Sequence, residues 1–437
     1  MPASPPGGGA PHDAFLAKQH VLFALRSAKY LPTPYQAEDN NRMTLAYFCL
    51  AALAVLPSSV VSTADLQLSA LQVMLKSAQR DGFVDWVYEQ QLPEGGFRGS
   101  DSLAAAAASA PSSISEMAKT DDPDLFPASP GTSSTSGPSA GSAAATLDNP
   151  HIIQSYTALL ILGLLDDDYS RLDRQGLVRF IGACQNGDGS FSQFPGSPEP
   201  GDPRSTYSAF AIASMLDDWS TIDIDRGLGF LNNCRRYEGG FSQRPGLEAN
   251  AGPTYCAIAS FSLASRLSSL ARPEQLLRWL VSRQVQPPPR PPRSETSDSE
   301  DGGDEDDDAA DEQTPEDSAG FQGRANKPTD ACYSFWNTAA LTLLLPAISP
   351  DLALSSLLDP ALDRAWLLDC QHRKFGGLAR EPGALPDVMH TYLALAALSL
   401  GDGAGTALGL RALDPAWNVP TEVAARVRDR LRRQRAA

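Results

Sequence analysis

The chain has 437 residues, 42% of them hydrophobic, and is therefore long enough to bury a large core in one or two domains. Residues 295–317 hold thirteen acidic side chains and no Lys or Arg, so the total net charge of −17 leaves only −4 for the rest of the chain. This distribution argues against a nucleic-acid-binding protein, for which we expect a basic face.

The six cysteines are scattered and include no Cys-x-x-Cys pair, which argues against a disulfide framework and favours a reducing compartment. The first residues, MPASPPGGGAPHDA, contain no apolar signal-peptide core. The longest apolar run, LAYFCLAALAVL, has twelve residues and is too short to span a bilayer. We therefore expect a cytoplasmic protein without a membrane-spanning segment.

In chain order, we expect a disordered tail at residues 1–15 and then a single domain at residues 16–437. Two low-complexity inserts are predicted to interrupt this domain. The first, at about residues 104–145, is rich in Ala, Ser, Gly and Pro, and the second, at about residues 286–318, is rich in Pro and then acidic. Both compositions are poor at burying apolar surface, so we expect both inserts to be disordered.

The rest of the chain repeats one pattern: a glycine turn, then Phe or Leu, a short polar link, and a Tyr at the start of an Ala- and Leu-rich helix. Four copies read GDGSFSQFPG…DPRSTYSAFAIASML, EGGFSQRPGLEANAGPTYCAIASFSL, AGFQGRANKPTDACYSFWNTAALTLL and FGGLAREPGALPDVMHTYLALAALSL. We align Tyr207, Tyr255, Tyr333 and Tyr392 in these copies, and DNPHIIQSYTALLILGLL has the same helix start at Tyr156.

Amphipathic segments such as DRGLGFLNNCRRY lead from each apolar helix to the next turn, so each unit is a pair of helices. About six such hairpins in tandem either stack as an open solenoid or close into a ring, the α/α barrel. The apolar helices are rich in small residues, as in YLALAALSL and YCAIASFSL, which favours a ring around a central cavity. We therefore expect an all-α fold, an α/α barrel or toroid.

The segment NKPTDACYSFW places a carboxylate and a thiol at a helix start. On its own it indicates a capped helix with a buried cysteine, because Asp330 is a good N-cap and Cys332 opens an apolar run. In the repeat alignment, however, Asp330 and Cys332 precede Tyr333 as His390 precedes Tyr392, so all three fall at the same corner of two consecutive hairpins. Mixed O, S and N ligands with one open position are typical of catalytic zinc, whereas Ca²⁺ and Mg²⁺ take more oxygens. We therefore predict a zinc site.

Cationic residues lie on the links before these two helices. Arg324 and Lys327 precede Asp330, and Arg380 precedes His390. Convergence of the three on one rim would bind an anion of several charges, most naturally phosphate. Beside an apolar cavity, this predicts a ligand with a diphosphate head and an apolar tail. Arg244, on the link of an earlier repeat, is expected to be a solvated surface cation.

The segments GRANKPTDACYSFW and GGLAREPGALPDVMHTY resemble those of protein prenyltransferase β subunits, and the resemblance extends over nearly the whole chain outside the inserts. Within that family, HVLFALRSAKYLPTPYQAEDNNRMTLAYF, GGFRGS and NKPTDACYSFW are most similar to the type I geranylgeranyltransferases. The resemblance implies an α/α barrel that pairs with a separate prenyltransferase α subunit. It also implies one Zn²⁺ per β subunit, held by Asp330, Cys332 and His390.

The implied reaction is transfer of a geranylgeranyl group from geranylgeranyl diphosphate to the cysteine of a C-terminal CaaX motif, with X often Leu. The implied protein substrates include Rho-type small GTPases, and zinc would activate their cysteine as a thiolate. The resemblance assigns catalytic roles to Lys327 and Tyr333 besides the zinc ligands. It assigns diphosphate binding to Arg324, Lys327, Tyr333, Arg380 and Asn250, and isoprenoid or peptide binding to Thr44, Arg204, Tyr207 and Trp336.

Three positions bear on which relative the chain resembles most. Arg380 stands where farnesyltransferases and Rab-type enzymes carry a magnesium-binding Asp, so we expect that Mg²⁺ is not required. Thr44 stands where farnesyltransferases carry a Trp, which leaves room for the longer geranylgeranyl tail. Asn250 replaces a diphosphate-contacting His and can donate a hydrogen bond but carries no charge, so we expect weaker diphosphate binding.

Other functions stay open at this point. A farnesyltransferase or Rab geranylgeranyltransferase β subunit would share the zinc ligands. A non-catalytic scaffold would keep the barrel without the chemistry, and Asn250 and the long inserts are the features that favour it. A terpene cyclase would need an acidic proton-donating motif, for which the sequence has no convincing match.

Overall fold

The computed structural model describes residues 15–30, 33–60, 68–101, 149–286, 319–401 and 407–436. The predicted tail at residues 1–15 and the predicted inserts at residues 104–145 and 286–318 lie outside these ranges, apart from residues 15 and 286. Within the described ranges almost all of the regular secondary structure is helical.

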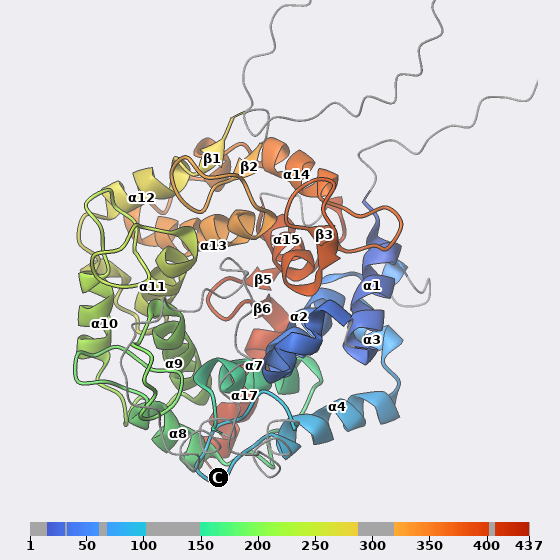
Figure 1. Ribbon diagram of the computed structural model, residues 1–437, viewed down its shortest axis with the longest axis vertical. Coiled ribbons are helices and arrows are strands. Elements are labelled where there is room, and N and C mark those ends of the chain that lie inside the picture. The colour runs from blue at the N-terminus through green and yellow to red at the C-terminus, as the bar shows by residue number, and fades with distance from the viewer. Residues whose placement is uncertain are drawn as a thin grey trace, which may run out of the picture.

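Helices of the described residues form two concentric layers (Figure 1). In the inner layer each helix contacts the next and the last contacts the first, so the ring is closed. The inner helices are α2 (Arg42–Val55), α7 (Ile152–Leu164), α9 (Pro203–Leu216), α11 (Ala251–Leu263), α13 (Ala331–Ile348) and α15 (Val388–Leu400). The outer helices are α1 (Ala17–Lys29), α4 (Ser77–Glu89), α8 (Arg174–Ala183), α10 (Ile224–Asn233), α12 (Pro273–Val281) and α14 (Pro360–Asp369). The predicted α/α barrel is confirmed.

Short elements complete the described structure. The remaining helices are α3 (Ala70–Met74), α17 (Thr421–Ala436), and the 3₁₀ turns η1 (Thr33–Asn41), η2 (Ser58–Val60), η3 (Leu267–Ser269) and η5 (Leu354–Ser356). Three antiparallel two-residue pairs join β1 (Gln284–Val285) to β2 (Gly320–Phe321), β3 (Leu378–Ala379) to β4 (Pro386–Asp387), and β5 (Leu413–Asp414) to β6 (Val419–Pro420). The first two pairs flank the links that lead into α13 and α15.

The inner helices are apolar because both their faces are buried, one against neighbours in the ring and one against the outer layer. One of them, α13, has enough length and apolar composition to cross a membrane, but most of it is buried between α11 and α15 as a core helix. With 18 residues, α13 is longer than LAYFCLAALAVL, the longest uninterrupted apolar run, which belongs to α2. Helix α13 gains this length because it continues past polar positions such as Asn337.

Glycine turns join the outer helices to the links. Gly189, for example, adopts φ +92°, and a Cβ atom there would lie 2.2 Å from the carbonyl oxygen of Arg226 at the next outer helix. Only glycine therefore fits this close approach without a shift of the backbone.

In four of the units, a glutamine beside the glycine turn joins the unit to the next. The side-chain oxygen of this glutamine accepts the amide of the residue that caps the next outer helix: Asp173 to Gln91 (2.9 Å), Asp223 to Gln185 (2.7 Å) and Asp359 to Gln284 (2.8 Å). The same contact occurs where the last unit meets the first, because Gln371 accepts the amide of Leu16 at 2.8 Å. We call this junction the seam.

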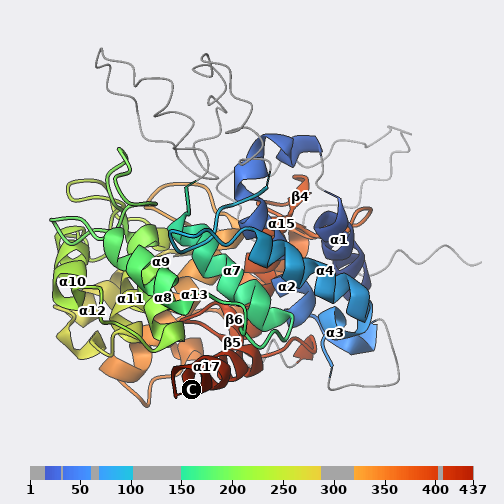
Figure 2. The same cartoon turned by 90° about the horizontal axis from the view of Figure 1, so that it is seen from below.

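One end of the ring holds the β5–β6 hairpin. Tyrosine hydroxyl groups of the inner helices bind four successive carbonyl groups of the hairpin: Tyr255 to Pro415, Tyr207 to Ala416, Tyr156 to Trp417, and both Tyr392 and Tyr47 to Asn418. Helix α17 then lies across this end and packs against α7 and α9 (Figure 2). The links into α13 and α15 lie at the opposite end.

Candidate metal centre

Asp330 caps the start of α13. Its Oδ1 accepts the amide of Cys332 at 2.8 Å, so the carboxylate leans back over the first turn toward the thiol-bearing residue. The amide of Ala331 donates to the carbonyl group of Arg380 at 2.9 Å. This bond ties the start of α13 to the link that leads into α15.

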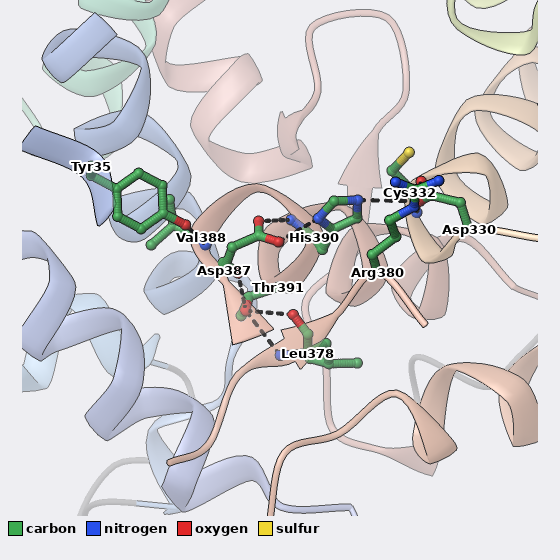
Figure 3. Close-up of polar contacts among 9 residues, drawn as sticks. All are labelled: Tyr35, Asp330, Cys332, Leu378, Arg380, Asp387, Val388, His390 and Thr391. Carbon is green, nitrogen blue, oxygen red and sulfur yellow. Dashed lines mark hydrogen bonds and ion pairs between the residues drawn. The ribbon is translucent and has the colours of Figure 1, made fainter. Parts of the chain in front are cut away.

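Helix α15 begins at the β3–β4 pair. Its first turn is held by Thr391, whose hydroxyl group accepts the amide of Leu378 at 2.9 Å and donates to the carbonyl group of Asp387 at 2.5 Å (Figure 3). Asp387 is the N-cap, and its Oδ1 accepts the amide of His390 at 2.8 Å. The imidazole of His390 thereby points toward the start of α13.

The structure brings together the carboxylate of Asp330, the thiol of Cys332 and the imidazole of His390. One ligand atom from each lies within 4.8 Å of the others, and all three residues are buried. Nε2 of His390 lies 3.2 Å from Oδ1 of Asp330. An O, S and N donor set of this size fits zinc with room for one further ligand.

Asp387 is a residue that sequence reasoning missed. Its Oδ2 lies 2.5 Å from Nδ1 of His390, so the carboxylate fixes the ring and leaves Nε2 to face Asp330 and Cys332. Metal-bound histidines usually have such a carboxylate partner on their other nitrogen. The available signal was the spacing Asp-x-x-His at a helix start, which is also that of an ordinary N-cap.

The electrostatics of the three ligands are coupled. Burial lowers the pKa of His390, but Asp330 and Asp387 outweigh it and hold this pKa well above its usual value. Burial raises the pKa of Asp330, but His390 and the Cys332 amide bring it below its usual value. Burial, with the Asp330 carboxylate, raises the pKa of Cys332 to about 12. A metal ion that binds here must therefore displace the thiol proton.

The structure corrects one part of the repeat alignment. Counted from the helix caps, the position of Tyr255 in α11 and Tyr392 in α15 is occupied in α13 by Phe335, not by Tyr333. Phe335 packs on Tyr255 with ring centroids 5.4 Å apart. Tyr333 lies two residues earlier, on the rim, where its side chain is half-buried. It therefore does not belong to the set of inner-helix tyrosines that bind the β5–β6 hairpin.

Tyr333 and Asn250 are brought together. Burial raises the pKa of Tyr333 to about 12, and a hydrogen bond with the Asn250 side chain partly offsets this rise. Oδ1 of Asn250 caps α11 by accepting the amide of Gly252 at 3.0 Å. The predicted diphosphate role of this pair stays a prediction.

The predicted anion-binding cations lie on the expected links, and the two arginines among them contact carboxylates. Arg380 lies with its Nε 3.3 Å from Oδ2 of Asp330, beside the metal site (Figure 3). Arg324 lies with its Nη1 3.5 Å from Oε2 of Glu248, and Lys327 is exposed. An anion at this rim would have to draw both arginines away from these partners.

The predicted isoprenoid and peptide residues fall into two groups. Thr44 and Tyr207 are buried: Thr44 donates its amide and hydroxyl group to Gln154 at 3.1 and 3.0 Å, and Tyr207 binds the β5–β6 hairpin. Trp336 and Arg204 are half-buried. The ring of Trp336 packs at a tilt against that of Tyr255, with centroids 5.1 Å apart, and Arg204 pairs with Asp202, the cap of α9, at 2.6 Å.

Comparison with known proteins identifies the family. A model described as the prenyltransferase alpha-alpha toroid domain matches residues 15–419. The chain is also 33% identical over 395 residues to the geranylgeranyl transferase type-1 subunit beta of Dictyostelium discoideum, and the match covers 87% of this chain and 89% of that one. This chain belongs to the β-subunit family of protein prenyltransferases.

Two further matches agree with this family. The geranylgeranyl transferase type-1 subunit beta of Arabidopsis thaliana is 29% identical over 415 residues, which cover 91% of this prenyltransferase chain and 88% of the relative. A chain of Candida albicans protein geranylgeranyltransferase-I, solved in complex with GGPP, has the same fold, with a TM-score of 0.70 and 24% identity over 95% of this chain and 99% of that one. The predicted family and fold are both confirmed.

Proposed function

We propose that this chain is the β subunit of a type I protein geranylgeranyltransferase, which acts as a heterodimer with a prenyltransferase α subunit. It would transfer the geranylgeranyl group of geranylgeranyl diphosphate to the cysteine of C-terminal CaaX motifs, as in Rho-type small GTPases. The proposal is supported by two relatives of this name and by the convergence of Asp330, Cys332 and His390 from consecutive repeats.

Asp330, Cys332 and His390 would hold one Zn²⁺, which when bound lowers the pKa of a coordinated substrate thiol. Asp387 would orient His390 through the 2.5 Å contact with Nδ1. The burial of the three ligands would exclude competing water from them. Arg324, Lys327 and Tyr333 would stabilise the negative charge that grows on the leaving diphosphate.

Arg380 and Thr44 are the residues on which we base the choice of a type I geranylgeranyltransferase over its relatives. A guanidinium group at residue 380 would substitute for a magnesium ion at the diphosphate, so we propose that Mg²⁺ is not required. The short side chain of Thr44 would leave room for the longer isoprenoid. The buried free cysteines of the described chain support a reducing compartment, and we propose that the enzyme is cytoplasmic.

The test compares two isoprenoid donors. We would co-express the chain with its cognate α subunit, remove free magnesium, and measure transfer from geranylgeranyl and farnesyl diphosphate to a peptide ending in Cys-a-a-Leu. The proposal predicts preferential geranylgeranyl transfer without magnesium. A preference for farnesyl diphosphate, together with a magnesium requirement, would instead indicate a farnesyltransferase β subunit, and a folded complex without any transfer would indicate a scaffold.

A further inference from the structure

Hydrogen bonds at the starts of the inner helices join the repeats along the rim that bears the metal site. In each case an amide in the first turn of one inner helix donates to a carbonyl group of the link before the next inner helix. The pairs are Met43 to Gly99 (3.0 Å), Ile152 to Gln193 (2.8 Å), Ala251 to Gly323 (2.9 Å) and Ala331 to Arg380 (2.9 Å). Helix α9 begins with Pro203, which has no amide hydrogen.

The seam differs from this pattern. The last inner helix is α15, and the link before the next inner helix, α2, contains η1. Here the first-turn amide of Val388 donates not to a carbonyl group but to the hydroxyl group of Tyr35, at 3.2 Å (Figure 3). At the seam, a hydroxyl group 353 residues away in sequence therefore accepts the amide that a backbone carbonyl group accepts elsewhere on the rim.

The residue next to Val388 is Asp387, which contacts the metal-site histidine. An N-cap side chain usually accepts the amide two or three residues further on, so the amide directly after the cap, here that of Val388, needs a different acceptor. Tyr35 supplies that acceptor, and both oxygens of Asp387 serve His390: Oδ1 takes its amide and Oδ2 contacts its Nδ1. The Tyr35 side chain is half-buried and remains neutral, since burial and then the Asp387 charge raise its pKa.

We propose that Tyr35 is a positioning residue of the metal centre: its hydroxyl group holds the first turn of α15 at the seam, and so holds Asp387 and His390 in the orientation that metal binding needs. The inference rests on the proposed function, because it concerns the same zinc site. It adds a residue of the first repeat to a site whose ligands all come from the last two.

The variant Tyr35→Phe removes only the hydroxyl group and leaves the Val388 amide without its acceptor. We would purify the complex with the α subunit, remove metal, and measure Zn²⁺ affinity by competition with a chromophoric chelator. Outer partners of metal ligands typically contribute roughly 10–100-fold to affinity, and we expect a loss of about tenfold for this variant. Co²⁺ absorption of the same complexes would report any change in ligand geometry.

The matched control is Tyr169→Phe. Tyr169 is buried and donates its hydroxyl group to the carbonyl group of Leu159 at 2.9 Å, within the helical repeat and not at the rim. The control should lower the unfolding temperature at least as much as Tyr35→Phe but leave Zn²⁺ affinity and the Co²⁺ spectrum unchanged. Equal Zn²⁺ affinity for wild type and Tyr35→Phe would overturn the inference.

A double variant tests whether Tyr35 acts through Asp387. If it does, Tyr35→Phe combined with Asp387→Asn should bind Zn²⁺ no more weakly than Asp387→Asn alone. The reason is that Asp387→Asn by itself already removes the orientation of His390 that Tyr35 would support. Independent, multiplicative losses would overturn the positioning role. A wild-type complex that takes up no Zn²⁺ would overturn the proposed function itself, and this inference with it.

Discussion

Oδ2 of Asp387 lies 2.5 Å from Nδ1 of His390, while Oδ1 of the same carboxylate caps the helix that carries this histidine. One side chain thus starts α15 and orients its imidazole. We predict that Asp387→Ala lowers Zn²⁺ affinity by roughly 10–100-fold, since the ring loses its partner. Chelator competition measures this loss. As a control, Asp223→Ala removes the cap of an outer helix, α10, and should leave Zn²⁺ affinity unchanged.

Cys332→Ala should abolish both zinc binding and prenyl transfer. It removes one of the three converging donor groups, so the loss of affinity should exceed the roughly 10–100-fold typical of outer partners. Metal analysis of the purified complex and single-turnover transfer measure the two effects. Cys370→Ala changes another buried cysteine, at the end of α14, and should retain both. Zinc retained by the Cys332 variant would contradict the site.

Arg380→Asp should make transfer depend on magnesium. The change removes the cation 3.3 Å from Asp330 and supplies the carboxylate that the resemblance to farnesyltransferases implies as a Mg²⁺ ligand at this position. Initial rates measured across a magnesium titration should rise for this variant and stay flat for wild type. Arg244→Asp, on the link of an earlier repeat, is the matched control and should also stay flat. A variant as magnesium-independent as wild type would refute the role given to Arg380.

Acid should destabilise the fold through His20. This histidine is fully buried at the seam, where Nδ1 accepts the amide of Gly377 at 2.9 Å and the opposite nitrogen, Nε2, contacts Gln371. Burial lowers the pKa of His20 to about 4, against about 6.5 in the unfolded chain. The unfolded state therefore binds the extra proton between these values, and stability falls as the pH drops through this window, by about 2 kcal/mol at pH 5.

Unfolding temperatures recorded from pH 7 to pH 4 test this prediction. His20→Gln keeps an acceptor and a donor but does not titrate, so its pH-dependent loss should be smaller than that of wild type. His372→Gln, at the neighbouring glycine turn, is the control and should keep the wild-type slope. Parallel curves for wild type and His20→Gln would show that another group governs the acid sensitivity.

The helical ring and the convergence of the three candidate metal ligands were predictable because they follow from a pattern that recurs along the chain. Each repeat encodes its own turn, link and helix start, so aligning repeats brings Asp330, Cys332 and His390 to one corner without any long-range information. The alignment matched Tyr333 with Tyr255 and Tyr392, whereas the structure has Phe335 at that position of the inner helix. The error did not move the ligands, since a shift of two residues still leaves them in the first turn.

Contacts that occur once are not predictable in this way. Tyr35 and Val388 meet only because the ring closes, and neither sequence position carries a local signal of its partner. Asp387 is hidden for a different reason: an Asp at a helix start is expected as a cap whether or not a histidine follows three residues later. The partners of the tyrosine hydroxyl groups likewise lie in a hairpin outside the repeat pattern.

The β5–β6 hairpin has a consequence for biosynthesis. Its four carbonyl groups bind tyrosines from helices that begin as early as residue 42 and as late as residue 388, so the inner face of every repeat but one is incomplete until residues 415–418 have been made. A nascent chain still attached to the ribosome at residue 412 would expose these phenol groups and an open seam. We therefore expect the helical hairpins to form in order during translation, whereas the inner face is completed only after residues 413–420 have been made, which leaves an interval in which chaperones can bind the unfinished ring.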